Sequence, residues 1–117
     1  MKSIAIIPAY NEEKTIGHVL AVLKVTPLIN KIIVVSDGST DNTVQVAKSY
    51  GVEVIELSEN RGKGGAIKAG LDNNKADVVL FLDADLIGLT PKHVLDLLEP
   101  VVNDHADMTI GIFEKGR

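Results

Sequence analysis

The chain has 117 residues, a formal net charge of −4 at pH 7 and 45% hydrophobic residues, which are the properties of one globular domain and exclude an intrinsically disordered chain. The absence of cysteine excludes disulfide scaffolds and thiolate metal sites. The acidic balance and the 3% aromatic content exclude a base-stacking platform, so we expect no nucleic-acid partner.

The first residues do not predict a signal peptide, because Pro8 interrupts the short apolar run that follows Lys2. All apolar runs are far shorter than the roughly 18 residues that span a bilayer. We therefore expect a cytoplasmic protein, and the sequence leaves room for peripheral membrane association of a longer protein.

Short runs rich in β-branched residues predict five strands. They cover residues 2–8, 31–36, 52–57, 77–83 and 107–113. Their apolar residues are continuous rather than alternating, which is typical of parallel strands that are covered on both faces. The segment 78–82 is the clearest case and should be an interior strand.

Helical patterns separate these runs. Apolar residues recur at i, i+3, i+4 and i+7 from 16 to 23 and again from 94 to 101. We expect Asn11 to cap the first of these helices, with Glu12 and Glu13 in its first turn. Thr90 and Pro91 are the expected N-cap and first residue of the last helix.

The two middle helices have weaker patterns. Ser39, Thr40 and Asp41 are cap candidates for the second helix, and Gly51 suits the position after its end. The third helix, at about 63–73, contains several glycines and is the least clearly defined.

Strands that alternate with helices predict an open α/β sandwich of three layers, with a mostly parallel sheet between two layers of helices. Ligands of such sheets bind outside the carboxyl ends of the strands. The loops that follow the strands are therefore the places to look for function.

The first two of these loops carry an aromatic and an acidic side chain. Pro8 ends the first strand, and Tyr10 offers an aromatic face at the edge of the sheet. After the second strand, Asp37 can accept hydrogen bonds from a ligand N–H or form a simple Asp-Gly turn with Gly38. Asp41 suits a structural role, either as a helix cap or in orienting the loop.

The third and fourth loops combine groups that bind phosphate and metal. Arg61 and Lys63 lie among glycines whose backbone N–H groups can approach an anion, although the Walker and dinucleotide patterns are absent. Asp83 and Asp85 follow a buried apolar strand. Two carboxylates at a sheet edge suit a hard cation whose coordination shell is completed by diphosphate oxygens.

The four loops together resemble the family 2 glycosyltransferases of the GT-A fold. The resemblance lies in Ile-Pro-Ala-Tyr-Asn-Glu-Glu, Val-Ser-Asp-Gly-Ser-Thr-Asp-Asn-Thr, Asn-Arg-Gly-Lys-Gly-Gly-Ala and Asp-Ala-Asp, in this order. The run Asp-Ala-Asp-Leu-Ile with the Pro91, His93-Val94 and Leu97-Leu98-x-Pro100 that follow is similar to glucosyl-3-phosphoglycerate synthases. Dolichyl-phosphate mannosyltransferases are another related branch.

The resemblance implies a glycosyltransferase that uses Mg²⁺ or Mn²⁺ and a UDP-sugar donor. The acceptor it implies is a lipid phosphate or a small phosphorylated acid. Asp85 is the implied main metal ligand, with Asp83 beside it. The implied nucleotide-binding residues are Pro8, Ala9, Tyr10, Asn11, Glu12, Asp37, Gly38, Lys63, Asp83 and Ala84.

Members of this family are substantially longer than this chain. We therefore expect residues 1–117 to be the N-terminal nucleotide-sugar-binding part, with the acceptor half and the catalytic base outside it. Glu114 is a weak candidate for the base, and His18, His93 and His105 suit surface or structural positions. A sheet without its covering half should expose apolar surface, so we also expect self-association.

Two other functions were weighed against glycosyl transfer. A receiver-type signalling domain needs an acidic pair at the end of the first strand and a phosphoacceptor aspartate at the end of the third. Here the first strand ends in Pro8-Ala9-Tyr10, the third ends in Leu57-Ser58, and the paired aspartates follow the fourth. A non-catalytic module that binds nucleotide sugars remains open, because binding requires only the residues named above.

Overall fold

The computed structural model describes residues 2–72, 74–103 and 109–113, and these form one alternating series of strands and helices. The elements are β1 (Ser3–Ala9), α1 (Ile16–Lys24), β2 (Lys31–Asp37), α2 (Thr43–Ser49), β3 (Glu53–Leu57), α3 (Gly62–Leu71), β4 (Val78–Leu82), α4 (Pro91–Asn103) and β5 (Thr109–Phe113). This order confirms the predicted one. Residues 107 and 108 of the expected last strand lie outside the described residues.

The five strands form one sheet in the order β3-β2-β1-β4-β5, and every adjacent pair is parallel. In the middle of the sheet, Ile6 of β1 is in register with Ile33 of β2 on one side and Phe81 of β4 on the other. Each of the five residues of β4 is buried, as expected for an interior strand. All carboxyl ends therefore meet at one edge, where β1 and β2 end in Ala9 and Asp37.

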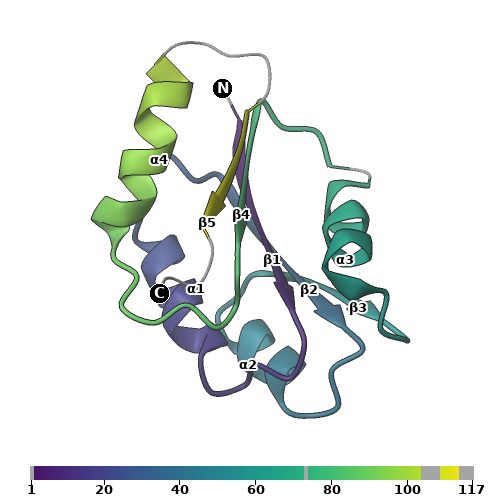
Figure 1. The fold of residues 1–117 in the computed structure, drawn as a ribbon. Helices are drawn as coiled ribbons and strands as arrows, with labels where there is room; N and C mark the ends of the chain where they lie inside the picture. Colours follow the sequence, from purple (N-terminus) through teal and green to yellow (C-terminus); the bar gives the residue numbers. More distant parts are fainter. Residues whose placement is uncertain (1, 73, 104–108, 114–117) are drawn as a thin grey trace.

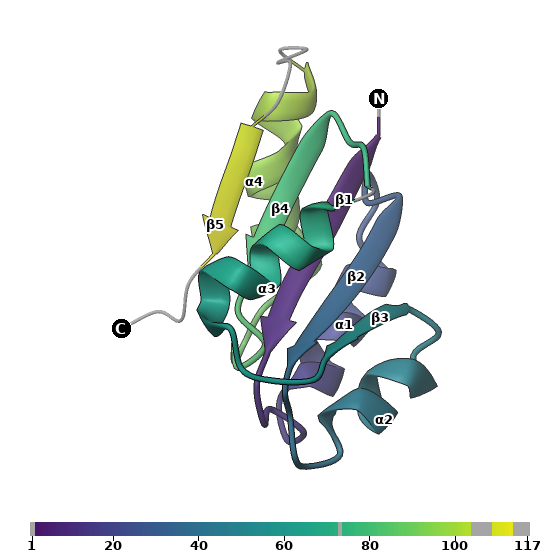
Figure 2. The same cartoon turned by 90° about the vertical axis from the view of Figure 1, so that its right-hand side faces the viewer.

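Helices cover both faces of the sheet (Figures 1 and 2). Helices α1, α2 and α4 pack on one face, and α3 packs on the other. Alternate strand residues point to each side, so Ile7 and Leu80 belong to the core under α1 and α4, whereas Ile6 and Val79 belong to the core under α3. The three-layer α/β prediction is confirmed.

Close packing against the sheet explains why α3 contains Gly70, one of the glycines that made this helix the least clearly predicted. A Cβ atom on Gly70 would lie 2.8 Å from Ile6 Cγ2 and 3.2 Å from Val35 Cγ2. The absence of a side chain therefore lets α3 approach β1 and β2 closely. The approach offsets the loss of helix propensity, which is about 1 kcal/mol for glycine relative to alanine.

One helix start was predicted wrongly. Helix α1 begins at Ile16 with Thr15 before it, so Asn11 does not cap it, and Glu12 and Glu13 lie outside its first turn. Asn11 has a left-handed backbone with φ of 52°. Its side-chain oxygen instead accepts hydrogen bonds from backbone N–H groups of the loop after β2.

The predicted boundaries of the other helices hold more closely. Gly51 follows the end of α2 with φ of 74°, and the Thr90 hydroxyl accepts the backbone N–H of His93 at the start of α4. Asp41 accepts the backbone N–H of Thr43 at 2.9 Å and so satisfies a donor at the start of α2.

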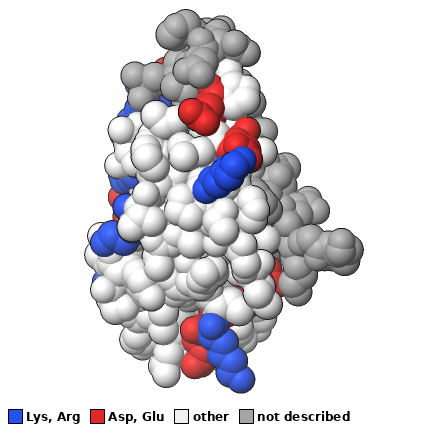
Figure 3. All heavy atoms as spheres, turned by 90° about the vertical axis from the view of Figure 1, so that its left-hand side faces the viewer, with Lys and Arg blue, Asp and Glu red and all other residues white. Residues whose placement is uncertain are grey.

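Charged side chains are sparse on the face of the molecule where α4 lies (Figure 3). On that face, the described lysines, arginines and acids are separated by wide areas without charge. Lys92 and Asp96 of α4 form an ion pair at 3.0 Å. Among the described residues, no helix has both the length and the apolar character needed to cross a bilayer.

Candidate functional site

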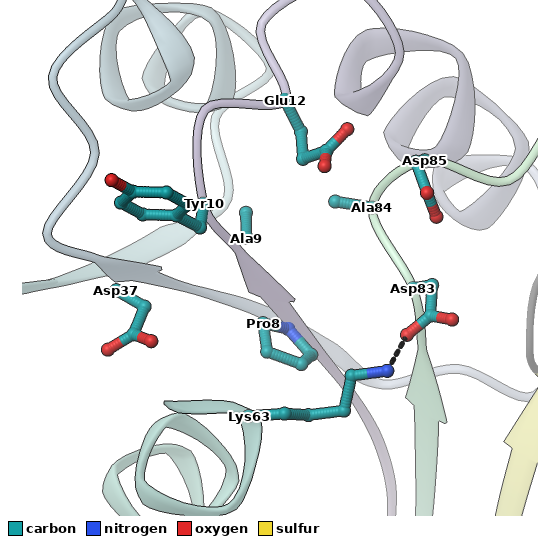
Figure 4. A pocket seen from close by; sticks show the side chains of 9 residues that line it. All are labelled: Pro8, Ala9, Tyr10, Glu12, Asp37, Lys63, Asp83, Ala84 and Asp85. Atoms are coloured by element: carbon teal, nitrogen blue, oxygen red, sulfur yellow. Dashed lines mark hydrogen bonds and ion pairs between the residues drawn. The ribbon is translucent and has the colours of Figure 1, made fainter. Parts of the chain in front are cut away.

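A pocket of about 270 Å³ lies at the carboxyl edge of the sheet, where the loops after β1, β2, β3 and β4 meet. Figure 4 shows the nine residues that line it. They are Pro8, Ala9, Tyr10, Glu12, Asp37, Lys63, Asp83, Ala84 and Asp85. All nine were predicted as nucleotide or metal residues, whereas Asn11 and Gly38 of that prediction lie outside this lining. The carboxyl ends of β1 and β2 with the loop after β1, the first turn of α3 and the loop after β4 therefore form one cavity.

Asp37 is the most buried acid of the pocket, with 5% of its surface exposed. Its two carboxylate oxygens accept the backbone N–H groups of Arg61 at 2.7 Å and Gly62 at 2.9 Å. Asn60 Oδ1 is a second acceptor of the Gly62 N–H, at 3.0 Å, so Asp37 and Asn60 together supply the acceptors at the start of α3. Asp37 therefore holds the loop after β3 in place, and each oxygen retains a second lone pair that can face a ligand.

A glycine is required at position 38 because the loop after β3 passes close to its backbone. Its φ is +80°, and a Cβ atom would lie 3.1 Å from the backbone nitrogen of Asn60 and 3.1 Å from the carbonyl carbon of Glu59. Both the backbone conformation and the available space favour glycine. The geometry gives Gly38 a packing function next to the pocket.

Lys63 spans the pocket from α3 to the end of β4. Its Nζ lies 2.6 Å from Asp83 Oδ1, and the ion pair is drawn in Figure 4. The Asp83 side chain is 20% exposed and the Lys63 side chain 59%. The cation of the glycine-rich loop and one of the predicted metal ligands are therefore in direct contact.

The donor set of the pocket suits a divalent cation that is shared with a ligand. Asp83 and Asp85 flank Ala84 on the loop after β4, and both carboxylates lie at the pocket. Among the described residues, no group of three or more acidic, histidine or cysteine side chains could hold a metal. Two hard oxygen donors fit Mg²⁺ or Mn²⁺ when ligand oxygens supply further coordination, as is usual for Mg²⁺ with phosphates.

The pocket is electrostatically unbalanced. Its lining contains four acidic side chains, from Glu12, Asp37, Asp83 and Asp85, and one basic side chain, from Lys63. A diphosphate placed beside these acids is repelled unless a cation accompanies it. This charge balance favours combined binding of an anion and a divalent metal.

Thr15 connects two sides of the pocket and was missed by the sequence analysis. Its hydroxyl oxygen lies 2.9 Å from the carbonyl oxygen of Ala84 and 3.2 Å from Glu12 Oε2. The hydroxyl has one hydrogen, so it donates to one of these acceptors at a time. The available signal was a threonine directly before the apolar stripe of α1, but Asn11 and the acids after it suggested an earlier helix start.

The loops after β1 and β2 are joined by a second set of hydrogen bonds. Asn11 Oδ1 accepts the backbone N–H of Thr40 at 2.8 Å, and the Thr43 hydroxyl accepts the backbone N–H of Glu12 at 2.9 Å. The Asp41 carboxylate accepts the hydroxyl and the backbone N–H of Thr43. These contacts fix the loop that carries Tyr10 and Glu12 at the pocket.

The pKa of Asp41 reflects this network. Burial acts to raise the pKa of the carboxyl group, but hydrogen bonds from the side chain and backbone of Thr43 and from the backbone of Glu13 outweigh it. The pKa of Asp41 is therefore lower than the ordinary value of an aspartate. The charged form is the one that holds the two loops together.

Two of the three histidines expected at surface or structural positions are among the described residues. His18 and His93 are exposed, and neither lines the cavity. Glu114 and His105 lie outside the described residues.

Comparison with known proteins shows which family the chain belongs to. The sequence profile of Glycosyl transferase family 2 matches residues 4–117. Glucosyl-3-phosphoglycerate synthase of Petrotoga mobilis is 33% identical over an alignment of 108 residues, and the match covers 82% of this chain and 33% of that protein. Dolichyl-phosphate beta-glucosyltransferase of Drosophila melanogaster is 45% identical over an alignment of 96 residues, and the match covers 68% of this chain and 29% of that protein.

A solved structure confirms the predicted fold. Glucosyl-3-phosphoglycerate synthase of Mycobacterium tuberculosis, in complex with Mn²⁺ and uridine-diphosphate-glucose, superposes with a TM-score of 0.76 at 32% identity. The match covers 86% of this chain and 39% of that one. The chain thus spans about a third of the length of the two curated relatives named above. The profile match over nearly the whole sequence shows that this chain belongs to glycosyl transferase family 2.

Proposed function

We propose that this chain binds the nucleotide-sugar donor, with a divalent cation, for a metal-dependent glycosyltransferase whose donor is a UDP-sugar. The observation that carries the proposal is the placement of Asp83, Asp85 and Lys63 in one pocket with the loop of Tyr10 and Glu12. The Mycobacterium tuberculosis relative named above, in complex with Mn²⁺ and uridine-diphosphate-glucose, supports the choice of ligands.

Each part of the pocket has a task in this proposal. Tyr10 is 48% exposed and offers a ring against which a base can stack. Asp37 and Glu12 supply acceptors for N–H and O–H groups of the nucleoside, and Lys63 supplies a positive charge for the diphosphate. Asp85 and Asp83 would hold the cation, which when bound supplies a Lewis acid beside the leaving nucleoside diphosphate.

The size of the pocket fits a part of the donor. A volume of about 270 Å³ lies just below the roughly 300–1,000 Å³ of typical small-molecule sites. In the proposal, the described residues bind the nucleotide part of the donor. The contacts to the sugar and the acceptor in this proposal come from other residues of a longer protein. The two relatives are compatible with this, because the chain covers only about a third of their length.

Calorimetry with several nucleotides tests the proposal. With Mn²⁺ present, we expect UDP to bind, GDP and ADP to bind more weakly, and Asp85→Ala to abolish the UDP signal. A lysine of the surface pair, Lys92→Ala, is the matched control and should bind UDP as the unchanged chain does, because its partner Asp96 lies on α4 away from the pocket. Equal binding of UDP by Asp85→Ala would contradict the proposal.

Turnover assays separate an enzyme from a binding module. UDP-glucose is incubated with the chain alone, with 3-phosphoglycerate and with dolichyl phosphate, and release of UDP is followed. Transfer to one acceptor supports the glycosyltransferase and identifies the acceptor class. Binding without hydrolysis or transfer would favour a nucleotide-sugar-binding module. A light-scattering measurement of the same sample tests the expected self-association, which a monomer at high concentration would contradict.

A further inference from the structure

We propose that Lys63 couples the binding of metal to the binding of nucleotide by exchanging its partner from Asp83 to the diphosphate. The inference rests on the proposed function, since it concerns the same ligands. It adds a mechanism by which each ligand raises the affinity of the other, and it assigns that mechanism to one side chain of α3.

The ion pair of Lys63 places a cation beside a carboxylate that is expected to bind a divalent metal. Lys63 Nζ lies 2.6 Å from Asp83 Oδ1 and reaches it from the first turn of α3 (Figure 4). The ammonium group and a metal ion carry the same sign of charge. A metal that binds without nucleotide therefore competes with Lys63 for Asp83 and is also repelled by it.

A nucleoside diphosphate without metal has the opposite problem. Lys63 attracts the diphosphate, but the acids of the pocket repel it, and Lys63 remains engaged with Asp83. The lysine side chain is 59% exposed and has a flexible four-carbon stem, so its ammonium group can turn to a phosphate while α3 stays in place.

Both conflicts are relieved when the two ligands are present together. Lys63 pairs with the diphosphate, Asp83 becomes available to the metal, and the metal offsets the charge of the acids. Each ligand then removes an obstacle to the other, which is positive coupling. Because coupling free energies are reciprocal, metal must raise nucleotide affinity by the same factor by which nucleotide raises metal affinity.

The test compares Lys63→Gln with Lys68→Gln, a change of the same charge on the same helix. Lys68 Nζ is 3.8 Å from Asp72 at the far end of α3, and neither residue lines the pocket. Mn²⁺ binding alone is followed by electron paramagnetic resonance, UDP binding alone by calorimetry with a chelator, and each is repeated with the other ligand present.

The exchange predicts effects of opposite sign on the two ligands. Lys63→Gln should bind Mn²⁺ alone about two- to fivefold more tightly, since a partly exposed ion pair no longer competes. The same variant should bind UDP in the presence of Mn²⁺ about tenfold more weakly, since the charge-assisted hydrogen bond from Lys63 to the diphosphate is lost, and it should bind UDP alone with a smaller loss. The factor by which each ligand raises the affinity of the other should fall several-fold, and the remaining coupling is that of the metal with the diphosphate and the acids. Lys68→Gln should match the unchanged chain in all of these measurements.

Several results would overturn the inference. Weaker Mn²⁺ binding by Lys63→Gln would mean that Lys63 assists the metal instead of competing with it, and values equal to those of Lys68→Gln would remove its role. Lys63→Arg keeps the charge and should retain weak Mn²⁺ binding, so a gain there would also count against the exchange. If the unchanged chain bound neither ligand, the proposed function would fail as well, whereas coupling as strong in Lys63→Gln as in the unchanged chain would refute only the exchange.

Discussion

Replacement of Asp37 by alanine should destabilise the chain through the loss of its bonds to the start of α3. The buried carboxylate accepts the N–H groups of Arg61 at 2.7 Å and Gly62 at 2.9 Å. The Gly62 N–H has a second acceptor, Asn60 Oδ1 at 3.0 Å, so it keeps a partner in the variant. The loss is therefore close to that of one charge-assisted hydrogen bond plus the interaction with the helix dipole, or about 2–3 kcal/mol.

Urea denaturation followed by circular dichroism measures this loss. For a domain of this size, it corresponds to a fall in melting temperature of roughly 8–12 °C. Asp37→Asn should lose less, because its amide oxygen still accepts one N–H. Asp96→Ala, which breaks an exposed pair on α4, is the control and should change stability by less than about 0.5 kcal/mol. If Asp37→Ala were as stable as this control, the role assigned to Asp37 would be refuted.

Two further predictions concern the network that holds the loops at the pocket. Since folding lowers the pKa of Asp41, its charged form adds stability above the ordinary aspartate pKa, and this contribution is lost as the pH falls through the lowered value. Asp41→Asn should therefore lower the free energy of unfolding by about 1 kcal/mol at pH 7 and by progressively less below about pH 4. Urea titrations at about pH 7 and at a pH below about 4 measure this, and an equal loss at the two would contradict the prediction. Thr15→Val, which removes the hydroxyl that joins the Ala84 and Glu12 sides of the pocket, should weaken UDP binding in Mn²⁺ several-fold, while Thr15→Ser should bind normally. Calorimetry that found Thr15→Val unchanged would assign Thr15 no part in the site.

The order of strands and helices along the chain and the position of the site could be predicted because they depend on local patterns. The unbroken apolar run of β4 indicates burial on both faces, and Asp83 and Asp85 follow it directly, so their place at the sheet edge follows from the parallel topology. Tyr10 and Lys63 were predicted at the same edge by the same reasoning, and both line the pocket.

Contacts between distant segments could not be predicted from these patterns. Asparagine is a common helix cap, yet the side chain of Asn11 accepts a hydrogen bond from the backbone N–H of Thr40, which is 29 residues away. Asp37 was considered as a ligand contact or a turn residue, and its bonds to the start of α3 depend on how the loop after β3 folds back. The fit of Gly70 against Ile6 likewise appears only when helix and sheet are packed together.

The central claim is that Asp83 and Asp85 bind a cation together with a nucleoside diphosphate. A thermal melt of the chain with Mn²⁺ alone, UDP alone and both ligands tests it most directly. Ligand at about 100 times its dissociation constant adds roughly 2.7 kcal/mol, which shifts the melting temperature of such a domain by on the order of 10 °C. We predict this shift only with both ligands, and its loss in Asp85→Ala. An equal shift with UDP and a chelator would contradict the claim.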